Sequence, residues 1–253
     1  MSDNSEDLVG LHIARYDVLG VPVSAVTLEI SSRVIREWAK DKVGRFICVR
    51  DVHGVMLAEK NPELIDIHRH AAMVTPDGMP LVWLGKWKGQ KVERTCGPDL
   101  MERLLTDSKS GNLKHFFYGS QPGVAQRLKE TFIDRFPQIQ IVGAETPPYT
   151  PLAQPALLKL AQQINESQAD ITWIGLSTPK QEYLMRDLVK YVDSTLIGVG
   201  AAFDFLSGSV TRAPKWMQYS GLEWSFRLVS EPRRLWRRYL VLAPKFVWKL
   251  LFK

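Results

Sequence analysis

The sequence predicts an α/β fold in which a parallel sheet is flanked by helices and followed by a basic helical appendage. Short apolar, β-branched runs alternate with longer segments of helical period, which is the pattern of successive βαβ units. Four of the helical segments begin with a proline that follows glycine, asparagine or glutamine, and proline suits the first position of a helix. The alternation stops near Gly208, so we expect a core over residues 1–208 and the appendage over residues 209–253.

Each element follows from its local pattern, taken in chain order. Runs rich in β-branched, leucine and aromatic residues predict strands at residues 45–49, 113–118, 139–142, 171–175 and 195–199, and a further apolar run covers residues 71–74. Helical periodicity predicts helices at residues 26–39, 62–70, 98–109, 122–136, 155–167 and 179–191. Beyond Gly208 we expect short helical stretches and then a helix over residues 235–251.

Composition limits the class of protein. The chain has 253 residues, of which 45% are hydrophobic, enough for a full core, and it contains no apolar run long enough (roughly 18 residues) to span a membrane. The acidic, polar start at residues 1–7 is unlike a signal peptide. Cys48 and Cys96 fit no metal spacing and no disulfide framework. These features predict a protein of the reducing cytoplasm.

The net charge of +6 is unevenly distributed. No acidic residue follows Glu231, whereas seven basic residues do, which leaves a net charge of −1 for the first 231 residues. A near-neutral body argues against nucleic-acid binding, because such proteins carry a basic footprint on a recognised module.

The stretch from Ile171 to Glu182 predicts a ligand-binding loop. An apolar run ends at Gly175, a small polar loop follows, and Pro179 is expected to open a helix that carries Lys180, Gln181 and Glu182 in its first turn. In open α/β sheets ligands bind beyond the carboxyl ends of the strands, and the free N–H groups of a helix start favour anions. Three long polar side chains in one turn are not expected to be packing residues.

Two further motifs admit a structural and a functional interpretation. Asp77 lies in a Pro-Asp-Gly sequence that is ordinary turn chemistry, but at the end of a strand its carboxylate could also take a proton from an attacking hydroxyl. Arg94 is either a surface charge or a planar fork that binds a phosphate or carboxylate. Asp99 suits a helix start.

The sequence predicts neither a dinucleotide cofactor nor a bound metal. A Gly198-Val199-Gly200 run begins like a dinucleotide fingerprint, but Phe203 replaces its third glycine, and Asp204 is then a site carboxylate or a helix cap. There is no His-x-x-x-His, Cys-x-x-Cys or Asp-x-Asp pattern, and the histidines of His68-Arg69-His70 are expected at the surface. Bound phosphates would be neutralised by cationic side chains and helix N-termini.

The C-terminal tail resembles a membrane-surface helix. Leu235, Trp236, Tyr239 and Leu240 can share one face with arginine pairs beside it, a pattern that suits an anionic bilayer, and Pro244 is expected to kink or break the helix. The alternative is a helix that packs on the body with a solvated basic face. An exposed apolar tail could equally serve a second copy of the chain.

Taken together, these segments resemble the WecG/TagA/CpsF family of bacterial glycosyltransferases over residues 16–246. The motifs that carry the resemblance are Pro76-Asp77-Gly78, Glu93-Arg94, Gly97-Pro98-Asp99-Leu100, Pro179-Lys180-Gln181-Glu182, Phe203-Asp204 with Gly208, Arg212-Ala213-Pro214, Gly221-Leu222-Glu223-Trp224 with Arg227, and Glu231-Pro232.

This resemblance implies an inverting, metal-independent enzyme with a Rossmann-like core. It implies transfer of a sugar from a UDP-sugar to a saccharide on undecaprenyl diphosphate, in bacterial surface or extracellular polysaccharide biosynthesis. Such an enzyme acts at the cytoplasmic face of the inner membrane as a peripheral protein, and its appendage helps complete the site.

The resemblance also implies roles for individual residues. Asp77 matches the proposed general base. The residues that match substrate-binding or charge-supplying positions are Arg94, Lys180, Gln181, Asp204, Arg212 and Arg227. Those that match the membrane-facing or lipid-diphosphate region are Arg233, Arg234, Trp236, Arg237 and Arg238.

One segment departs from the family pattern. Where the family often has Thr-Pro-Asn, this chain has Val49-Arg50-Asp51, followed two residues later by His53. Asp51 or His53 is expected to take over the substrate contacts, or the donor differs from N-acetylmannosamine-type sugars. The departure also leaves room for an alternative, a non-catalytic membrane-bound subunit that only binds a sugar nucleotide.

Overall fold

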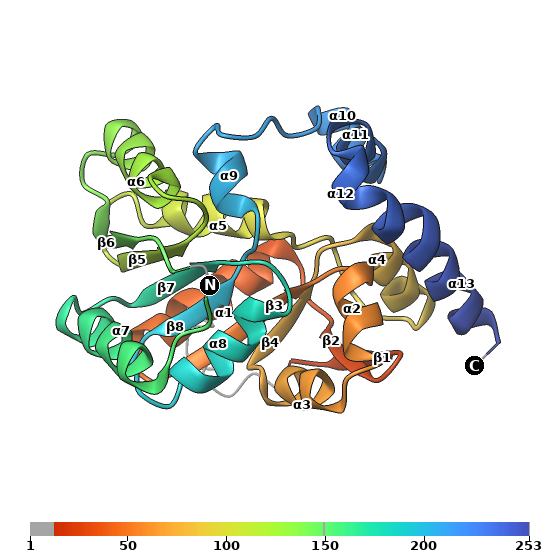
Figure 1. The fold of residues 1–253 in the computed structure, drawn as a ribbon, viewed down its shortest axis with the longest axis horizontal. Helices are drawn as coiled ribbons and strands as arrows, with labels where there is room; N and C mark the ends of the chain where they lie inside the picture. Colours follow the sequence, from red (N-terminus) through yellow and green to blue (C-terminus); the bar gives the residue numbers. More distant parts are fainter. Residues whose placement is uncertain (1–12, 149, 253) are drawn as a thin grey trace, which may run out of the picture.

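The computed structural model describes residues 13–148 and 150–252. Its centre is a six-stranded, all-parallel sheet in the order β4-β3-β8-β7-β5-β6, which confirms the predicted fold class (Figure 1). A separate antiparallel hairpin, which the sequence pattern did not reveal, precedes it. The hairpin strands are β1 (Arg15–Val18) and β2 (Val21–Ser24), and the sheet strands are β3 (Arg45–Arg50), β4 (Met73–Pro76), β5 (Lys114–Gly119), β6 (Gln140–Glu145), β7 (Ile171–Gly175) and β8 (Thr195–Gly198).

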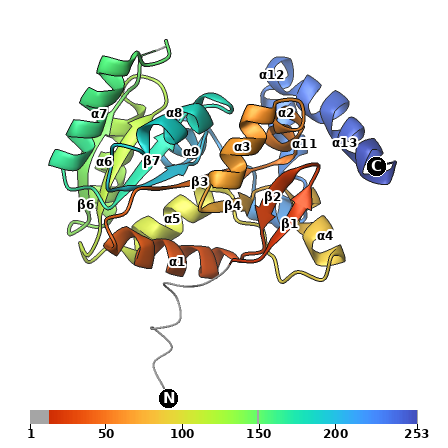
Figure 2. The ribbon, with the colours of Figure 1, turned by 90° about the horizontal axis from the view of Figure 1, so that it is seen from below.

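Helices cover both faces of the sheet, as Figure 2 shows from below. One face packs on α1 (Leu28–Lys40), α5 (Gly97–Asp107), α6 (Val124–Arg135) and α9 (Ala202–Leu206). The other packs on α2 (Val52–Ala58), α3 (Pro62–His70), α4 (Met79–Trp87), α7 (Gln154–Glu166) and α8 (Lys180–Leu188). Because side chains alternate along a strand, β3 sends Phe46 and Cys48 into one hydrophobic cluster and Ile47 into the other. Strands buried on both faces explain the nearly continuous apolar runs in the sequence.

Helix starts follow the capping chemistry that the sequence indicates. Asn61 is the N-cap of α3, and its side chain accepts hydrogen bonds from the backbone N–H groups of Glu63 and Leu64, with Pro62 at the first position. The helix predicted from Pro122 instead begins at Val124, after Gly123 in a left-handed conformation (φ 84°). The predicted helix from Pro179 begins one residue later, at Lys180.

The C-terminal region is helical, as expected, and comprises α10 (Lys215–Tyr219), α11 (Glu223–Ser230), α12 (Pro232–Trp236), η1 (Arg237–Leu242) and α13 (Ala243–Leu251). Of the two outcomes expected at Pro244, a kink or a break, the break does not occur. The six residues before α13 form a π-helical segment, in which the N–H of Ala243 bonds to the carbonyl of Arg238, and the helical path continues through the proline. Buried Leu235 and Phe246 attach this region to the body.

Three smaller predictions can be compared with the structure. Cys48 and Cys96 are both free thiols and both are buried. His68, predicted at the surface, is fully buried, and burial lowers its pKa to about 3, whereas His70 is exposed as predicted. The acidic start at residues 1–7 lies outside the described residues.

Candidate functional site

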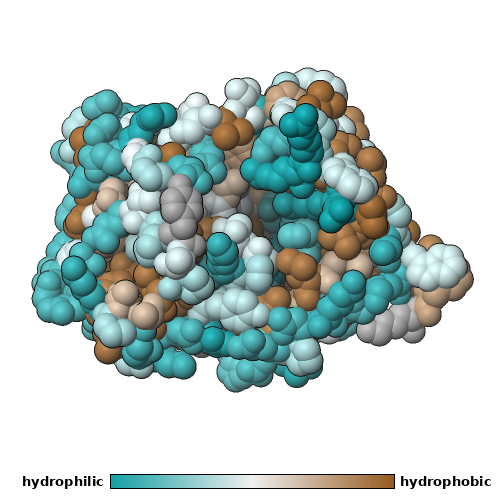
Figure 3. Space-filling model, viewed as in Figure 1, coloured by the Kyte–Doolittle hydropathy of each residue, from teal (hydrophilic) through white to brown (hydrophobic). Residues whose placement is uncertain are grey.

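A cavity of about 1130 Å³ opens at the carboxyl ends of the sheet strands. Loops that follow all six strands line it, and the C-terminal helices form its opposite wall. Figure 3 shows the molecular surface hollowed between the body and these helices. Ligands of open α/β sheets bind at this edge, where the connections of neighbouring strands diverge: here β3 leads outward to β4, while its neighbour β8 leads to α9.

Glycines allow the strand ends to meet at the cavity floor. A Cβ atom on Gly119, the last residue of β5, would lie 2.5 Å from the Cα of Gly175, the last residue of β7. A Cβ on Gly175 would in turn lie 2.9 Å from the ring of Phe203. The apolar run that ends at Gly175 therefore needs a glycine there for packing, before the polar loop reaches the cavity.

Asp77 lies in the cavity at the end of β4. Its N–H donates to the carbonyl of Arg50 (2.7 Å), which ties the turn after β4 to the last residue of β3, while its side chain remains 33% exposed. Burial raises the pKa of this carboxyl above its usual value; Arg94 opposes the rise and Glu223 adds to it. A carboxyl with a raised pKa is a better proton acceptor than an ordinary aspartate.

Arg94 and Arg212 are joined by a carboxylate that the sequence analysis assigned no role. Glu223 of α11 accepts from Arg94 Nη2 at 2.6 Å and lies 3.5 Å from Arg212 Nε. Arg94 also donates from Nε to the backbone oxygen of Asp77 (2.8 Å), and its Nη2 lies 3.7 Å from the Asp77 carboxylate. Glu223 and Arg94 thereby tie α11 to the turn that carries Asp77.

Arg212 lies behind this network rather than on the cavity wall. It donates to Asp99 Oδ1 (2.5 Å) and contacts Cys96 Sγ (3.4 Å). Although burial opposes it, hydrogen bonds from Arg212 and Cys96 lower the pKa of Asp99. Arg212 and Asp99 thus bond to each other and lie outside the set of residues that line the cavity.

The three long polar side chains at the start of α8 lie in different surroundings, one exposed at the cavity and two buried. Lys180 is exposed and lines the cavity. Gln181 and Glu182 are buried, so the expectation that none of the three packs inside is wrong for both. Gln181 accepts from the N–H of Gly200 (3.1 Å) and donates to Glu182 (3.0 Å), although its side chain still forms part of the cavity wall.

The carboxylate of Glu182 is the partner of Arg50, the residue that marks the departure from the family pattern. The two side chains form an ion pair in which both are almost completely buried, and Arg50 also donates to Thr178 (3.2 Å). The ion pair links β3 to α8, and the bond to Thr178 links β3 to the loop before α8. Gly54 leaves room for it, because a Cβ there would lie 2.5 Å from Arg50 Nη1.

Asp51 and His53 both line the cavity, but Asp51 already has partners within the protein. Its Oδ1 accepts from the N–H of Gly54 (2.8 Å) as the N-cap of α2, and its Oδ2 forms an ion pair with Arg238 of the C-terminal region. Asp51 therefore fastens the tail to the body at the cavity edge. For His53, burial with a contribution from Arg50 lowers the pKa and favours the neutral form.

The remaining predicted residues are distributed between the cavity and its surroundings. Asp204 lies in the cavity after β8 and accepts a hydrogen bond from Ser120 at the end of β5. Arg227 lines the cavity, with its guanidinium 5.4 Å from the centre of the Phe205 ring. From the tail, Arg234, Arg237 and Arg238 line the cavity, whereas Arg233 and Trp236 lie outside it.

Sequence reasoning missed several residues of the cavity wall. Ser120 and Gln121 follow β5, and their position after a predicted strand was a usable signal. Trp83, Trp224 and Tyr239 depend on how α4 and the tail are placed against the body, which no local pattern specifies.

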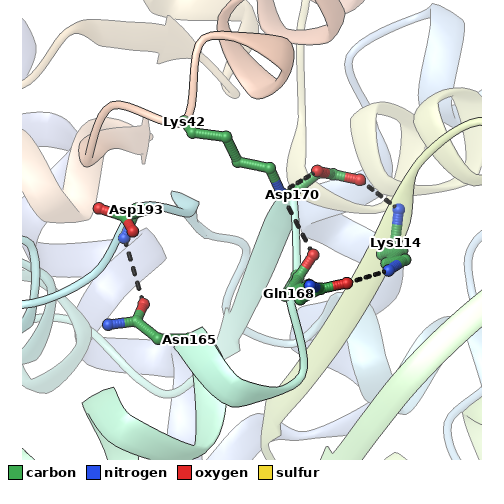
Figure 4. A pocket seen from close by; sticks show the side chains of 7 residues that line it. Lys42, Lys114, Asn165, Gln168, Asp170 and Asp193 are labelled. Atoms are coloured by element: carbon green, nitrogen blue, oxygen red, sulfur yellow. Dashed lines mark hydrogen bonds and ion pairs between the residues drawn. The ribbon is translucent and has the colours of Figure 1, made fainter.

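A second, smaller pocket of about 500 Å³ lies at the opposite, amino-terminal edge of the sheet (Figure 4). Its polar groups bond to one another. Lys42 pairs with Asp170, Lys114 donates to Gln168 Oε1 (2.7 Å), and Asn165 accepts from the N–H of Asp193 (3.3 Å). These contacts tie strand starts together, and we assign the pocket no ligand.

Residues 13–148 and 150–252 contain no group of three or more His, Cys, Asp or Glu side chains placed to hold a metal ion. None of their helices has the length and hydrophobicity needed to cross a bilayer.

Comparison with protein families agrees with the motifs and the geometry. The model of the family described as "Glycosyl transferase WecG/TagA/CpsF family" matches residues 16–253, nearly the whole chain. The chain therefore belongs to the WecG/TagA/CpsF family of glycosyltransferases, enzymes that move a sugar from a donor to an acceptor.

Proposed function

We propose that the protein transfers a sugar from a UDP-sugar to a saccharide on undecaprenyl diphosphate in one displacement that inverts the anomeric carbon. The enzyme acts as a peripheral protein on the cytoplasmic face of the inner membrane, in the biosynthesis of a bacterial surface or extracellular polysaccharide. The observation that carries this proposal is a carboxylate with a raised pKa, Asp77, in a large cavity whose other wall bears several arginines.

In this reaction the acceptor hydroxyl attacks the anomeric carbon as Asp77 takes its proton, and the bond to the diphosphate oxygen breaks. A carboxyl becomes a better general base as its pKa rises toward the working pH, and burial raises the pKa of Asp77. Because the hydroxyl attacks the face opposite the leaving UDP in one displacement, with no enzyme-bound sugar in between, the configuration at the anomeric carbon inverts.

The leaving UDP gains negative charge and needs fixed donors. Arg94 is held by the Asp77 backbone and by Glu223, so it requires little rearrangement during the reaction. Arg227, Arg234, Arg237 and Lys180 add positive charge along the cavity wall. These groups support a reaction in which protein cations, rather than a divalent ion, neutralise the diphosphate.

Calorimetry with UDP, combined with an assay for released UDP in the presence of EDTA, tests this proposal. We expect binding of UDP and release of UDP only when donor and lipid-linked acceptor are both present. Binding without release from any donor would instead favour a subunit that holds a sugar nucleotide without transferring the sugar. A requirement for a divalent ion would refute the metal-independent mechanism.

A further inference from the structure

The helix α4 presents two exposed tryptophans beside the cavity. Trp83 and Trp87 are 56% and 83% exposed and lie one helical turn apart, so they share one face. Trp83 lines the cavity, whereas Trp87 lies outside it, so this face leads from the cavity to the outer surface. Large exposed aromatic side chains in pairs are typical of a surface that meets another phase or partner.

The position of this helix is fixed by its opposite face. Leu81 and Val82 are buried, and the carbonyl of Leu81 accepts a hydrogen bond from Tyr16 (3.0 Å). Gly85 allows close packing, since a Cβ there would lie 2.7 Å from Val92 Cγ1. The tryptophans are therefore held outward by a well-packed helix rather than by a loop.

The charged residues that flank the two tryptophans along α4 and the segment after it are all basic. Residues 79–91 contain Lys86, Lys88 and Lys91 and no acidic residue, and all three lysines are exposed. Tryptophan next to lysine is the pattern of side chains that sit at the interface of an anionic bilayer. The three exposed lysines beside the tryptophans thus fit an anionic lipid surface.

This face adjoins the C-terminal region. Gly221, in the turn before α11, lies against α4, since a Cβ there would be 3.2 Å from Met79 Cγ and 3.9 Å from Trp83. Figures 1 and 2 place α4 and α13 at the same end of the long axis of the molecule. There α13 exposes Trp248 and Leu251, with Phe252 following.

We propose that the Trp83–Trp87 face of α4, with Lys86, Lys88 and Lys91, is a second contact with the anionic membrane, separate from the C-terminal helices. This inference rests on the proposed action at a membrane, and it adds the direction in which the cavity opens relative to the bilayer. With lipid contacts on both α4 and the tail, the cavity between them faces the bilayer, and a polyprenyl-linked acceptor enters without leaving the lipid.

The test measures partition of the full chain onto vesicles of phosphatidylcholine mixed with phosphatidylglycerol. The variant is Trp87→Ser with Lys88→Gln, two residues outside the cavity. The control is Leu158→Ser with Lys159→Gln on α7, which exposes a matched pair and lies at the opposite end of the long axis (Figure 1). The variant loses one lysine contact with the lipid and one tryptophan that would insert into the bilayer, so its partition coefficient should fall roughly 50-fold. The partition coefficient of the control should fall by less than about threefold.

Each outcome bears on the inference. Weaker vesicle binding with unchanged UDP affinity supports it. Wild-type vesicle binding by the variant overturns it and leaves the proposed function standing. If the wild-type protein itself does not bind these vesicles, the membrane part of the proposed function fails together with the inference. If the variant instead lowers the mass of the protein in solution while vesicle binding is unchanged, the face joins copies of the chain and the inference is wrong.

Discussion

Replacement of Asp77 by asparagine separates catalysis from folding. Asparagine has nearly the same size but cannot accept the proton, so kcat should fall about 10²- to 10⁴-fold, the range for loss of a general base, or roughly 3–5 kcal/mol of transition-state stabilisation. Binding of UDP should change little, because the leaving-group cations stay in place.

The contacts of Arg94 indicate how small the effect on stability should be. Its Nη2 lies 3.7 Å from the Asp77 carboxylate, but its shorter bonds, 2.6 Å to Glu223 and 2.8 Å to the Asp77 backbone oxygen, survive the substitution. A partly exposed pair of this kind contributes about 0–1 kcal/mol. The raised pKa also means that the folded protein disfavours the ionised carboxylate, so removing the charge offsets part of that loss.

The assay compares turnover and thermal unfolding of Asp77→Asn with those of Asp66→Asn, which removes an exposed carboxylate on α3. We expect a melting temperature within about 4 °C of wild type for both and a large loss of kcat for Asp77→Asn alone. Turnover within threefold of wild type would refute the role of Asp77. A variant that fails to fold would refute the stability argument.

Three further predictions follow from the same contacts. The acid limb of the pH dependence of kcat/KM should lie above the ordinary aspartate pKa of 3.8, because Asp77 must be ionised to act as the base. Since Glu223 raises the pKa of Asp77, Glu223→Gln should move that limb to lower pH. A pH–rate profile whose acid limb does not move would contradict this. Glu182→Gln should reduce the free energy of unfolding by about 3–5 kcal/mol, because it leaves Arg50 charged and buried, whereas Arg50→Met with Glu182→Leu should recover most of the loss in denaturant titrations. Vesicle binding should weaken as salt rises from low to high concentration, because screening shortens the reach of the basic residues, and salt-independent binding would point to purely apolar attachment.

The sequence predicted the architecture well where local chemistry decides the outcome. The strand Ile171–Gly175 and the helix Pro62–His70 have the predicted bounds, because an unbroken apolar run and an Asn-Pro cap are both local signals. The hairpin of β1 and β2 was missed. Its strands have only four residues each, and β2 contains Pro22, which argues against a strand, so the alternating pattern is too short and too irregular to stand out.

The site was predictable as a set of residues but not as a set of partners. Asp77, Arg94 and Asp204 were expected near the ligand because they follow strands or match family motifs, and all three line one cavity. No pattern along the chain indicated that Arg238 would pair with Asp51, 187 residues away, or that Glu223 would join Arg94 to Arg212. Such pairings depend on how the C-terminal helices pack on the body.

The departure from the family pattern illustrates the same limit. The sequence offered Asp51 and His53 as replacements for lost substrate contacts, but Arg50, the last residue of β3, pairs inward with the buried Glu182. Burial of a charged pair cannot be inferred from either residue alone, since charged side chains are rarely buried unless paired.

The most direct test of the central claim is transfer from a panel of UDP-sugars to a short-chain polyprenyl-diphosphate-linked saccharide, with EDTA present throughout. The account predicts that one donor gives a lipid-linked product of inverted anomeric configuration, and that Asp77→Asn does not form it at a comparable rate. A product with retained configuration, or one formed equally well by Asp77→Asn, would contradict the account.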